Sequence, residues 1–344
     1  MSRLLTAFGP GRVNLIGEHT DYNQGLALPF AIADGVTVRF GPLGDRRIEA
    51  VAVDLDERDE FSLDDVSPAE GWRAFVRGAV GELSRFGVSL RGSVLEISGT
   101  VPRGAGLSSS AALEVALVLA LLAVAGEPEP DRIELARLCS RIENDWVGAQ
   151  TGLLDQIASL CGQPDQALLI DFASVSVRSV PLELGDFRLL TLDSGEEHTH
   201  ASGGYNQRRE ECAQAAERLG VASLREATLE MASDLPSPLS LRVRHVVGEN
   251  ERVRVAVRAL ERGDMPELGR LLDASHASLR DCYEVSTDAV EDAVARCKRA
   301  GALGVRIMGG GFGGNVLALL PAAASAPEGA VEVRPGPGAK VSTA

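Results

Sequence analysis

Lysine is almost absent from this chain of 344 residues. Only two of its 34 basic residues are lysines, Lys298 and Lys340, and all the others are arginines. Walker-type phosphate loops and protein-kinase sites both place a lysine against the transferred phosphates. Both mechanisms are therefore excluded in the N-terminal half. A phosphate bound there must be met by backbone N–H groups, arginine or a metal ion.

Paired cysteines and long apolar runs are missing as well. The five cysteines are scattered and form no CxxC pair, so neither a disulfide framework nor a zinc site is expected. The longest apolar run, 115–125, has 11 residues and is too short to span a bilayer. No basic segment with an apolar core follows Met1, so we expect no secretory leader. These features predict a cytoplasmic protein with free thiols and no membrane partner.

Positive charge is in deficit, because the formal net charge is −15. This argues against nucleic acid or an anionic membrane surface as a partner. An apolar content of 45% with 24% charged residues is typical of a globular protein, long enough here for two domains. We place the boundary between residues 1–175 and 176–344. From residue 321 onward the chain is rich in Ala, Pro and Gly, and we expect little structure there except at 331–333.

The hydrophobic pattern predicts a mixture of strands and helices. Strands are expected at 3–9, 26–32, 37–40, 48–53, 167–171, 175–180, 187–193, 305–308 and 315–320. Helices are expected at 73–86, 111–125, 131–148, from about 153, and at 206–219, 246–262, 265–280 and 287–300. The charged segment 54–65 reads as solvated turn and edge structure.

The segment 101–114 carries the first candidate site. A strand leads into a loop with Gly104 and Gly106, three serines follow, and an apolar helix begins near Ala111. Loop glycines that open a helix N-terminus, with hydroxyls as further donors, suit a phosphate. A strand–turn–helix joint with a serine cap explains the same residues, so this segment alone leaves both interpretations open.

The loop 10–25 carries the second candidate. It places Arg12, Glu18, His19, Asp21 and Tyr22 between two apolar strands. A sugar or another polyol requires donors and acceptors that converge at fixed positions. A solvated surface loop could account for any two of these residues, but it accounts less easily for all five.

Three further segments are ambiguous on their own. Asp155 opens an apolar helix, where a carboxylate is favourable without any catalytic role. Glu143 can equally be a surface glutamate with no function. Tyr205 can equally be an aromatic residue at the start of a helix. The segment 308–315 satisfies GxGxxG, but a strand follows it where a dinucleotide fingerprint requires a helix. A strand–glycine loop–strand is expected there, and a dehydrogenase is the least favoured function.

Together these segments resemble the GHMP family of small-molecule kinases. The loop Gly-Arg-Val-Asn-Leu-Ile-Gly-Glu-His-Thr-Asp-Tyr-Asn, the segment Pro-Arg-Gly-Ala-Gly-Leu-Ser-Ser-Ser-Ala-Ala and the segment Gly-Gly-Gly-Phe-Gly-Gly occur in family order. The first is similar to the signature of the galactokinase group. The resemblance implies a two-domain α+β fold with the active site in the cleft between the domains. Its N-terminal domain would be mixed β/α with a left-handed β-α-β unit, and its C-terminal domain ferredoxin-like.

The resemblance also implies roles for particular residues. Asp155 matches the catalytic aspartate and Arg12 the arginine beside it. Matches to the sugar contacts are Glu18, His19, Thr20, Asp21, Gly152 and Tyr205. The ATP phosphates would lie on Gly104, Ala105, Gly106, Leu107, Ser108, Ser109 and Ser110. Ser110 and Glu143 match the Mg²⁺ positions.

The implied reaction is transfer of the γ-phosphoryl group of ATP to the anomeric hydroxyl of galactose by a monomeric enzyme. Such a transfer requires alignment and charge neutralisation more than covalent help. We expect Asp155 to take the proton late, and a purely electrostatic role for Arg12 and Asp155 stays open. The alternatives are a kinase for N-acetylgalactosamine or arabinose, and a sensor that binds galactose and ATP without turnover. A sensor has no need of all four residues Ser110, Glu143, Asp155 and Arg12.

Overall fold

The computed structural model describes residues 5–101, 106–149, 151–196 and 201–343. The strands are β1 (Leu5–Asn14), β2 (Leu26–Ala27), β3 (Pro29–Pro42), β4 (Arg47–Ala52), β5 (Glu57–Ser62), β6 (Ser93–Gly99), β7 (Gln166–Asp171), β8 (Ser176–Pro181), β9 (Phe187–Asp193), β10 (Gly304–Ile307), β11 (Asn315–Pro321), β12 (Val331–Val333) and β13 (Lys340–Thr343). The α-helices are α1 (Trp72–Arg85), α2 (Ser109–Ala125), α3 (Arg132–Arg141), α4 (Leu154–Cys161), α5 (Ala201–Leu219), α6 (Leu239–Arg262), α7 (Met265–Asp281) and α8 (Asp288–Arg299). Shorter turns of helix are η1 (Asp21–Asn23), η2 (Val53–Leu55), η3 (Ile142–Val147), η4 (Leu224–Glu226) and η5 (Met231–Asp234).

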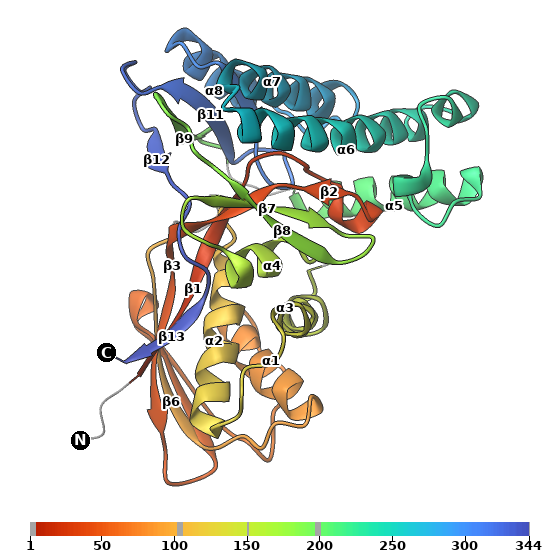
Figure 1. The fold of residues 1–344 in the computed structure, drawn as a ribbon. Coiled ribbons are helices and arrows are strands. Elements are labelled where there is room, and N and C mark those ends of the chain that lie inside the picture. Colours follow the sequence, from red (N-terminus) through yellow and green to blue (C-terminus); the bar gives the residue numbers. More distant parts are fainter. Residues whose placement is uncertain (1–4, 102–105, 150, 197–200, 344) are drawn as a thin grey trace.

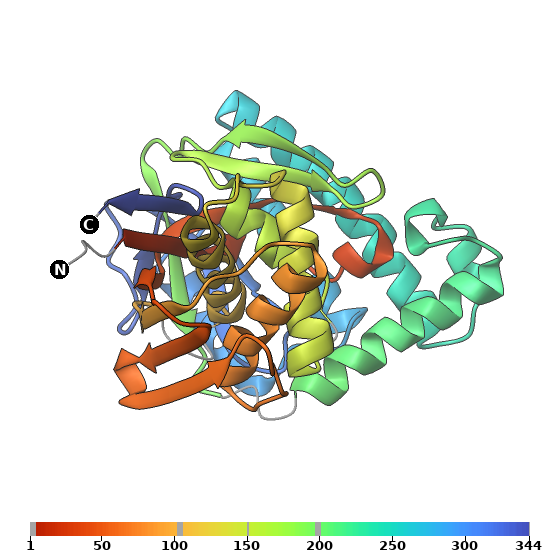
Figure 2. The same cartoon turned by 90° about the horizontal axis from the view of Figure 1, so that it is seen from below.

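The first half of the chain builds a six-stranded sheet in the order β13-β1-β3-β6-β4-β5. Its neighbours pair antiparallel except β4 and β6, which are parallel and connected through β5 and α1. Helices α1, α2 and α3 lie together on one side of this sheet (Figures 1 and 2). The parallel pair with its crossing helix is a β-α-β unit, as expected for this half.

Helix α2 lies deep in this half because nearly all of its residues are apolar. Glycines in β1 let the backbones of β1 and α2 approach each other closely. A Cβ atom at Gly9 would lie 2.1 Å from the carbonyl oxygen of Ala112 in α2. A Cβ atom at Gly11 would lie 2.6 Å from the carbonyl oxygen of Leu107, just before the helix. These two contacts fix the N-terminus of α2 against β1.

The second half contains a four-stranded sheet in the order β10-β11-β9-β12, with α6, α7 and α8 beside it (Figure 1). The glycine-rich segment 308–314 connects β10 to β11, which pair antiparallel. The expected strand–glycine loop–strand is confirmed, and the helix that a dinucleotide fingerprint requires does not follow this loop.

Among the described residues, the buried apolar side chains form three cores. One lies between the six-stranded sheet and α1 to α4, and another lies among α5 to α8 and the four-stranded sheet. A third contains side chains from β1 and β3 together with side chains from α6, α7 and β11. This shared core holds the two halves against each other, so residues from both can form one site.

Several expected elements need correction. The strands expected at 26–32 and 37–40 are mostly one long strand, β3. The helix expected at 131–148 ends as α-helix at Arg141 and continues as the π-helical turn η3. Its predicted start is confirmed, because the Asp131 side chain accepts from the backbone N–H groups of Ile133 and Glu134.

The tail is more ordered than its composition predicts. The expected strand at 331–333 is confirmed as β12, which pairs with β9. A further strand, β13, pairs with β1 at the edge of the first sheet. Pairing with a partner far away in sequence leaves no local pattern, so composition alone could not show this strand.

The division at residues 175 and 176 stays a prediction. Strand β8 pairs with β7 in a three-stranded sheet, β2-β7-β8, and so lies with the residues before the boundary. The end of the chain, β13, also joins the six-stranded sheet of the first half, where it pairs with β1.

Candidate active site

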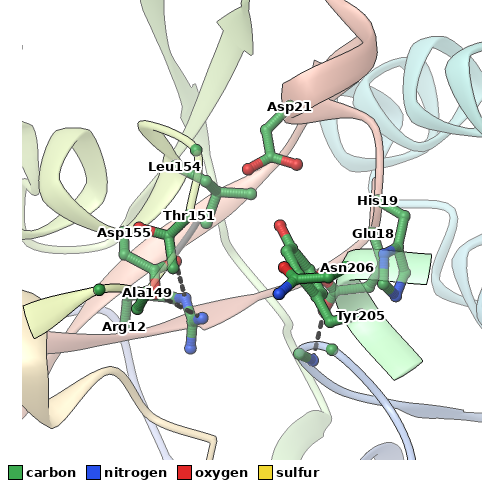
Figure 3. A pocket seen from close by; sticks show the side chains of 14 residues that line it. Arg12, Glu18, His19, Asp21, Ala149, Thr151, Leu154, Asp155, Tyr205 and Asn206 are labelled. Atoms are coloured by element: carbon green, nitrogen blue, oxygen red, sulfur yellow. Dashed lines mark hydrogen bonds and ion pairs between the residues drawn. The ribbon is translucent and has the colours of Figure 1, made fainter. Parts of the chain in front are cut away.

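A cavity of about 300 Å³ lies where the two halves meet. Figure 3 shows Arg12 and Asp155 on one side, Glu18 and His19 on the other, and Asp21 and Tyr205 around the space between them. The cavity is lined by Arg12, Glu18, His19, Asp21, Gly148, Ala149, Thr151, Gly152, Leu154, Asp155, Tyr205, Asn206, Gly309 and Gly310. The structure therefore brings together both predicted catalytic residues and five of the six predicted sugar contacts.

Arg12 reaches the cavity from an irregular part of β1. The register between β1 and β3 shifts between Pro10 and Arg12, and such a bulge redirects the side chains that follow it. The guanidinium binds both carboxylate oxygens of Asp155, with Nε 2.8 Å from Oδ1 and Nη2 2.9 Å from Oδ2. A bidentate ion pair of this kind fixes the orientation of both side chains.

Asp155 is also connected to the segment that opens α2. The Ser108 hydroxyl donates a hydrogen bond to Asp155 Oδ2, and Arg12 Nη1 donates to the carbonyl oxygen of Gly106. Ser108 precedes α2 with φ of 57°, a left-handed conformation that non-glycine residues seldom adopt. The predicted catalytic pair is thus built into the start of the predicted phosphate loop.

Glu18 is held by groups from the second half of the chain. Arg306 Nη2 lies 3.1 Å from Glu18 Oε1, and the backbone N–H of Gly309 donates to the same oxygen at 2.8 Å. Arg306 is fully buried in β10 and also donates to the carbonyl oxygen of Asn14 at 2.7 Å. Arg306 therefore anchors both ends of the segment 14–18 to β10.

Asp21 carries a carboxylate that its surroundings stabilise poorly. Burial, followed by the nearby carboxylates of Asp155 and Glu18, raises the Asp21 pKa to about 6, although hydrogen bonds from backbone N–H groups oppose the shift. The residue facing it is Gly152, where a Cβ atom would lie 1.9 Å from Asp21 Oδ2. Gly152 therefore makes room for the carboxylate.

His19 is a neutral imidazole in the cavity wall. Burial, together with the positive charge that His245 would carry, lowers the His19 pKa to about 3. Its backbone has φ of 59°, and the side-chain amide of Asn23 donates to its carbonyl oxygen at 2.8 Å. The ring of Tyr205 lies over it with a centroid separation of 5.4 Å. Strain held by local hydrogen bonds is common at ligand sites.

Thr20, the sixth predicted sugar contact, is not among the residues that line the cavity. It is fully buried, and its hydroxyl lies 2.9 Å from the carbonyl oxygen of Gly17 and 2.8 Å from that of Leu26. A hydroxyl has one hydrogen to donate, and here it is directed at the loop's own backbone. Thr20 shapes the loop that presents its neighbours.

The start of α2 opens onto a second cavity, of about 700 Å³. Ser109 and Ser110 line it together with the apolar side chains of Phe75, Ile97 and Leu113. Leu107 is buried, and its carbonyl oxygen accepts from the backbone N–H of Arg12 at 3.0 Å, so it shapes the loop. The predicted phosphate contacts Gly104 and Ala105 lie outside the described residues.

Glu143 lies beside Ser110 among buried polar groups. Burial raises the pKa of Glu143, while hydrogen bonds from Thr151, Ser110 and Gln156 oppose that shift. The Gln156 amide donates both to Glu143 at 3.0 Å and to the buried carboxyl of Glu114 at 3.1 Å. A serine hydroxyl and a carboxylate are hard oxygen donors, the set that Mg²⁺ prefers. Two buried carboxyl groups near each other also favour a cation at this place.

Sequence reasoning missed several residues of the site. Arg306 had a visible signal, because it is a charged residue inside an otherwise apolar strand, and such a residue requires a partner. Thr151 and Asn206 are sequence neighbours of predicted residues, so their positions could have been included. The hydrogen bond between Ser108 and Asp155 joins residues far apart in the sequence, so no local sequence pattern could indicate it.

Family descriptions match three parts of the chain. The family described as "GHMP kinases N terminal domain" matches residues 74–163, and the family described as "GHMP kinases C terminal" matches residues 256–334. Galactokinase galactose-binding signature matches residues 2–42, which contain Arg12 and the loop from Glu18 to Asp21.

Relatives in other organisms are similar over nearly the whole chain. A galactokinase of Mycobacterium tuberculosis (strain ATCC 25618 / H37Rv) is 44% identical over 321 residues, which is 91% of this chain and 88% of that protein. A galactokinase of Streptomyces coelicolor is 41% identical over 331 residues, covering 91% and 84% of the two chains.

Solved structures agree with this similarity. The crystal structure of Lactococcus lactis galactokinase complexed with galactose has a TM-score of 0.92 and 32% identity, covering 98% of this chain and 95% of that one. The mevalonate kinase of Methanococcus jannaschii, at 16% identity and a TM-score of 0.72, shares the fold. The expected two-domain α+β fold is confirmed. This chain belongs to the galactokinases, within the GHMP kinase family.

Proposed function

We propose that this protein transfers the γ-phosphoryl group of ATP to the anomeric hydroxyl of galactose, giving galactose 1-phosphate and ADP. One observation carries the proposal. Arg12 and Asp155 pair in the wall of a cavity that also presents Glu18, His19 and Asp21, and Ser108 connects that pair to the start of α2. A sugar and a nucleotide phosphate bound there would meet at Asp155.

The sugar would occupy the smaller cavity. Galactose presents hydroxyls on every side, and Glu18 and Asp21 supply carboxylate acceptors while the His19 side chain forms part of the cavity wall. The Tyr205 ring and Gly152 complete the walls. We assign these five residues to sugar binding, and we assign Thr20 to the shape of the loop.

The nucleotide would occupy the larger cavity, with its phosphates at the start of α2. The first N–H groups of that helix have no partner within it and carry the positive end of its dipole. Ser109 and Ser110 add hydroxyls there, and Phe75 and Leu113 offer apolar surface to a base. Arginine and backbone groups take the place of the lysine that the sequence lacks in this half.

We assign the role of base to Asp155. Its two oxygens are each held from one side, one by Arg12 and the other by Arg12 and Ser108. A carboxylate oxygen accepts at more than one position, so a sugar hydroxyl can donate to it as well. As the anomeric oxygen bonds to phosphorus and the bond to the ADP oxygen breaks, the proton passes to Asp155. Arg12 stabilises the carboxylate, so this transfer occurs late, as the loose transition state forms.

Ser110 and Glu143 would hold Mg²⁺. The hydroxyl and carboxylate supply few protein oxygens, and Mg²⁺ commonly takes its other ligands from phosphates and water. When bound, the ion would neutralise charge on the phosphate oxygens. The Gln156 amide keeps the Glu143 carboxylate in position.

An assay of ADP release with galactose, glucose, N-acetylgalactosamine and arabinose tests the proposal. We expect turnover with galactose, and loss of it when a chelator removes Mg²⁺. Turnover with none of the four sugars would overturn the kinase proposal. Preference for another sugar would overturn only the substrate. A cytoplasmic location, based on the composition, and a monomeric state, based on the family resemblance, are further proposals. Among the described residues, no helix is both long and apolar enough to cross a membrane.

A further inference from the structure

The wall of the sugar cavity is rich in hydrogen-bond acceptors. Three carboxylates belong to it, those of Glu18, Asp21 and Asp155. An ionised carboxylate accepts hydrogen bonds and donates none. These groups can therefore bind the hydrogens of sugar hydroxyls, but they supply no donor to the oxygen atoms of the sugar.

Two donor side chains of this wall are directed at other groups of the protein. Arg12 donates to both carboxylate oxygens of Asp155 and to the carbonyl oxygen of Gly106. The Thr151 hydroxyl donates to Glu143 Oε2 at 2.7 Å. A hydroxyl has one hydrogen to donate, so Thr151 offers a ligand only its lone pairs.

The His19 ring is also occupied within the protein. Its Nδ1 atom lies 2.8 Å from the Tyr22 hydroxyl, and the ring forms a hydrogen bond with the backbone of Gly310. Two polar side chains of the wall then remain that can donate to a sugar, those of Tyr205 and Asn206.

Asn206 follows Tyr205 in α5 and lines the cavity. Its side chain is half-buried, and Figure 3 shows the amide end turned into the space between the two walls. No hydrogen bond joins this amide to another described residue, whereas the amide of the next residue, Gln207, donates to Glu211 Oε1 at 3.0 Å. The Asn206 amide is therefore available to a ligand in the cavity.

An amide supplies what the carboxylates lack, because it has two N–H donors beside its acceptor oxygen. The ring oxygen of a sugar carries no hydrogen and can only accept, and each hydroxyl oxygen accepts as well as donates. A sugar oxygen that leaves water without finding a donor weakens binding.

We propose that the side-chain amide of Asn206 donates a hydrogen bond to one oxygen of the bound sugar, and that it contributes to the choice of sugar through that oxygen. This contact adds a binding residue to the sugar site and rests on the proposed function.

Asn206→Ala tests the contact, with galactose binding measured by calorimetry in the absence of ATP. We expect binding to weaken roughly five- to tenfold, because one hydrogen bond is lost. Asn206→Asp keeps the shape but replaces the donor by a further carboxylate, so it should weaken binding at least as much. Gln207→Ala is the matched control, since it removes an amide from the same helix at a residue that does not line the cavity. It should leave binding unchanged.

Three results would overturn the proposal. Asn206→Ala could bind galactose as tightly as the unsubstituted protein does. Gln207→Ala could show an equal loss, which would assign the effect to α5 as a whole. Asn206→Ala could instead weaken ATP binding and leave galactose binding intact, which would assign the amide to the nucleotide.

Galactose analogues that each lack one oxygen, the ring oxygen and the anomeric hydroxyl included, identify the partner of the amide. The analogue without that oxygen should bind Asn206→Ala and the unsubstituted protein almost equally, while the others keep the difference. The same loss for every analogue would mean that Asn206 acts through the shape of the cavity, and the hydrogen bond would be wrong.

The amide can also be followed directly by NMR. The side-chain ¹⁵N–¹H signals of Asn206, identified by their loss in Asn206→Asp, should shift when galactose is added. Signals that stay in place at saturating galactose would contradict the contact. None of these measurements requires turnover, so absence of ADP release with all four sugars would overturn the kinase function while the binding results decide the contact. An unsubstituted protein that binds no galactose would overturn the sugar site and this contact together.

Discussion

Asp155 and Arg12 show how one side chain can be held and still react. Replacing one carboxylate oxygen by an amide nitrogen changes the shape of the side chain little, although the nitrogen can no longer accept a hydrogen bond from Arg12. We predict that Asp155→Asn retains galactose and ATP binding but loses roughly 10²-fold or more in kcat, because the base is gone. Calorimetry and ADP-release kinetics measure the two effects separately. A variant with near-normal kcat would show that Asp155 acts only through its charge or position.

Asp21 is held at a cost in stability. An acid whose pKa is raised on folding destabilises the folded state once the pH exceeds its ordinary pKa of 3.8, and the full cost is present above its folded pKa of about 6. We predict that Asp21→Asn raises Tm by about 2–5 °C near pH 8 and changes it little near pH 4. The same change should weaken galactose binding at least tenfold, because an acceptor is lost.

In the unsubstituted protein, KM for galactose should increase as the pH falls through about 6, because Asp21 then becomes protonated. The increase should be absent in Asp21→Asn. Asp34→Asn makes the same chemical change at an exposed position and is the matched control. If Tm increases equally in both variants, the carboxylate of Asp21 is not the cause.

At the scale of elements, the cavity depends on how closely η1 approaches the turn that precedes α4. Gly152 in that turn leaves room for Asp21, and a methyl group would have to displace the carboxylate. We predict that Gly152→Ala raises KM for galactose at least tenfold while Tm changes by no more than about 3 °C, because the displaced group is the end of a flexible side chain.

Gly44→Ala is the control for that prediction, since nothing lies within 4 Å of a Cβ atom there. Steady-state kinetics over a range of galactose concentrations measure the change. Unchanged KM in Gly152→Ala would mean that Asp21 moves without loss of sugar contact.

Elements with local signals could be predicted from the sequence, and contacts between distant elements could not. The cap at Asp131 and the glycine loop after β10 depend on neighbouring residues, so their patterns identify them. Thr20 lies inside a matching motif, yet its hydroxyl points to the backbone of the loop. A motif gives the order of the residues, and only the folded loop determines which side chains face the ligand.

At the scale of the whole molecule, the two halves share an apolar core and one site, and side chains of one half bind residues of the other. Arg306 of β10 binds Glu18 and the backbone of Asn14, both from the first half. Helix α5 carries Tyr205, and the strand before it, β9, belongs to the second sheet. The sugar site therefore exists only when both halves are folded together.

The tail extends this dependence to the first sheet. Strand β13 covers the edge of β1, with Ala7 opposite Val341 and Phe8 opposite Lys340. The residues before it donate backbone hydrogen bonds to the first half: Gly338 N–H to the carbonyl oxygen of Gly162 at 2.7 Å, and Ala339 N–H to that of Ser159 at 2.9 Å. The last residues of the chain thus stabilise its first strand.

Removing residues 336–344 should therefore destabilise the first half. Several backbone hydrogen bonds of about 1 kcal/mol each are lost, so we predict a decrease in Tm of roughly 5 °C or more. The uncovered edge of β1 should also promote association between chains, because an unpaired strand edge is a template for pairing. Calorimetry and light scattering measure the two effects. A variant that keeps the length but replaces residues 340–343 with proline removes the N–H groups that pairing requires, and so separates pairing from length. If that variant unfolds at the original temperature, the pairing of β13 with β1 contributes nothing to stability.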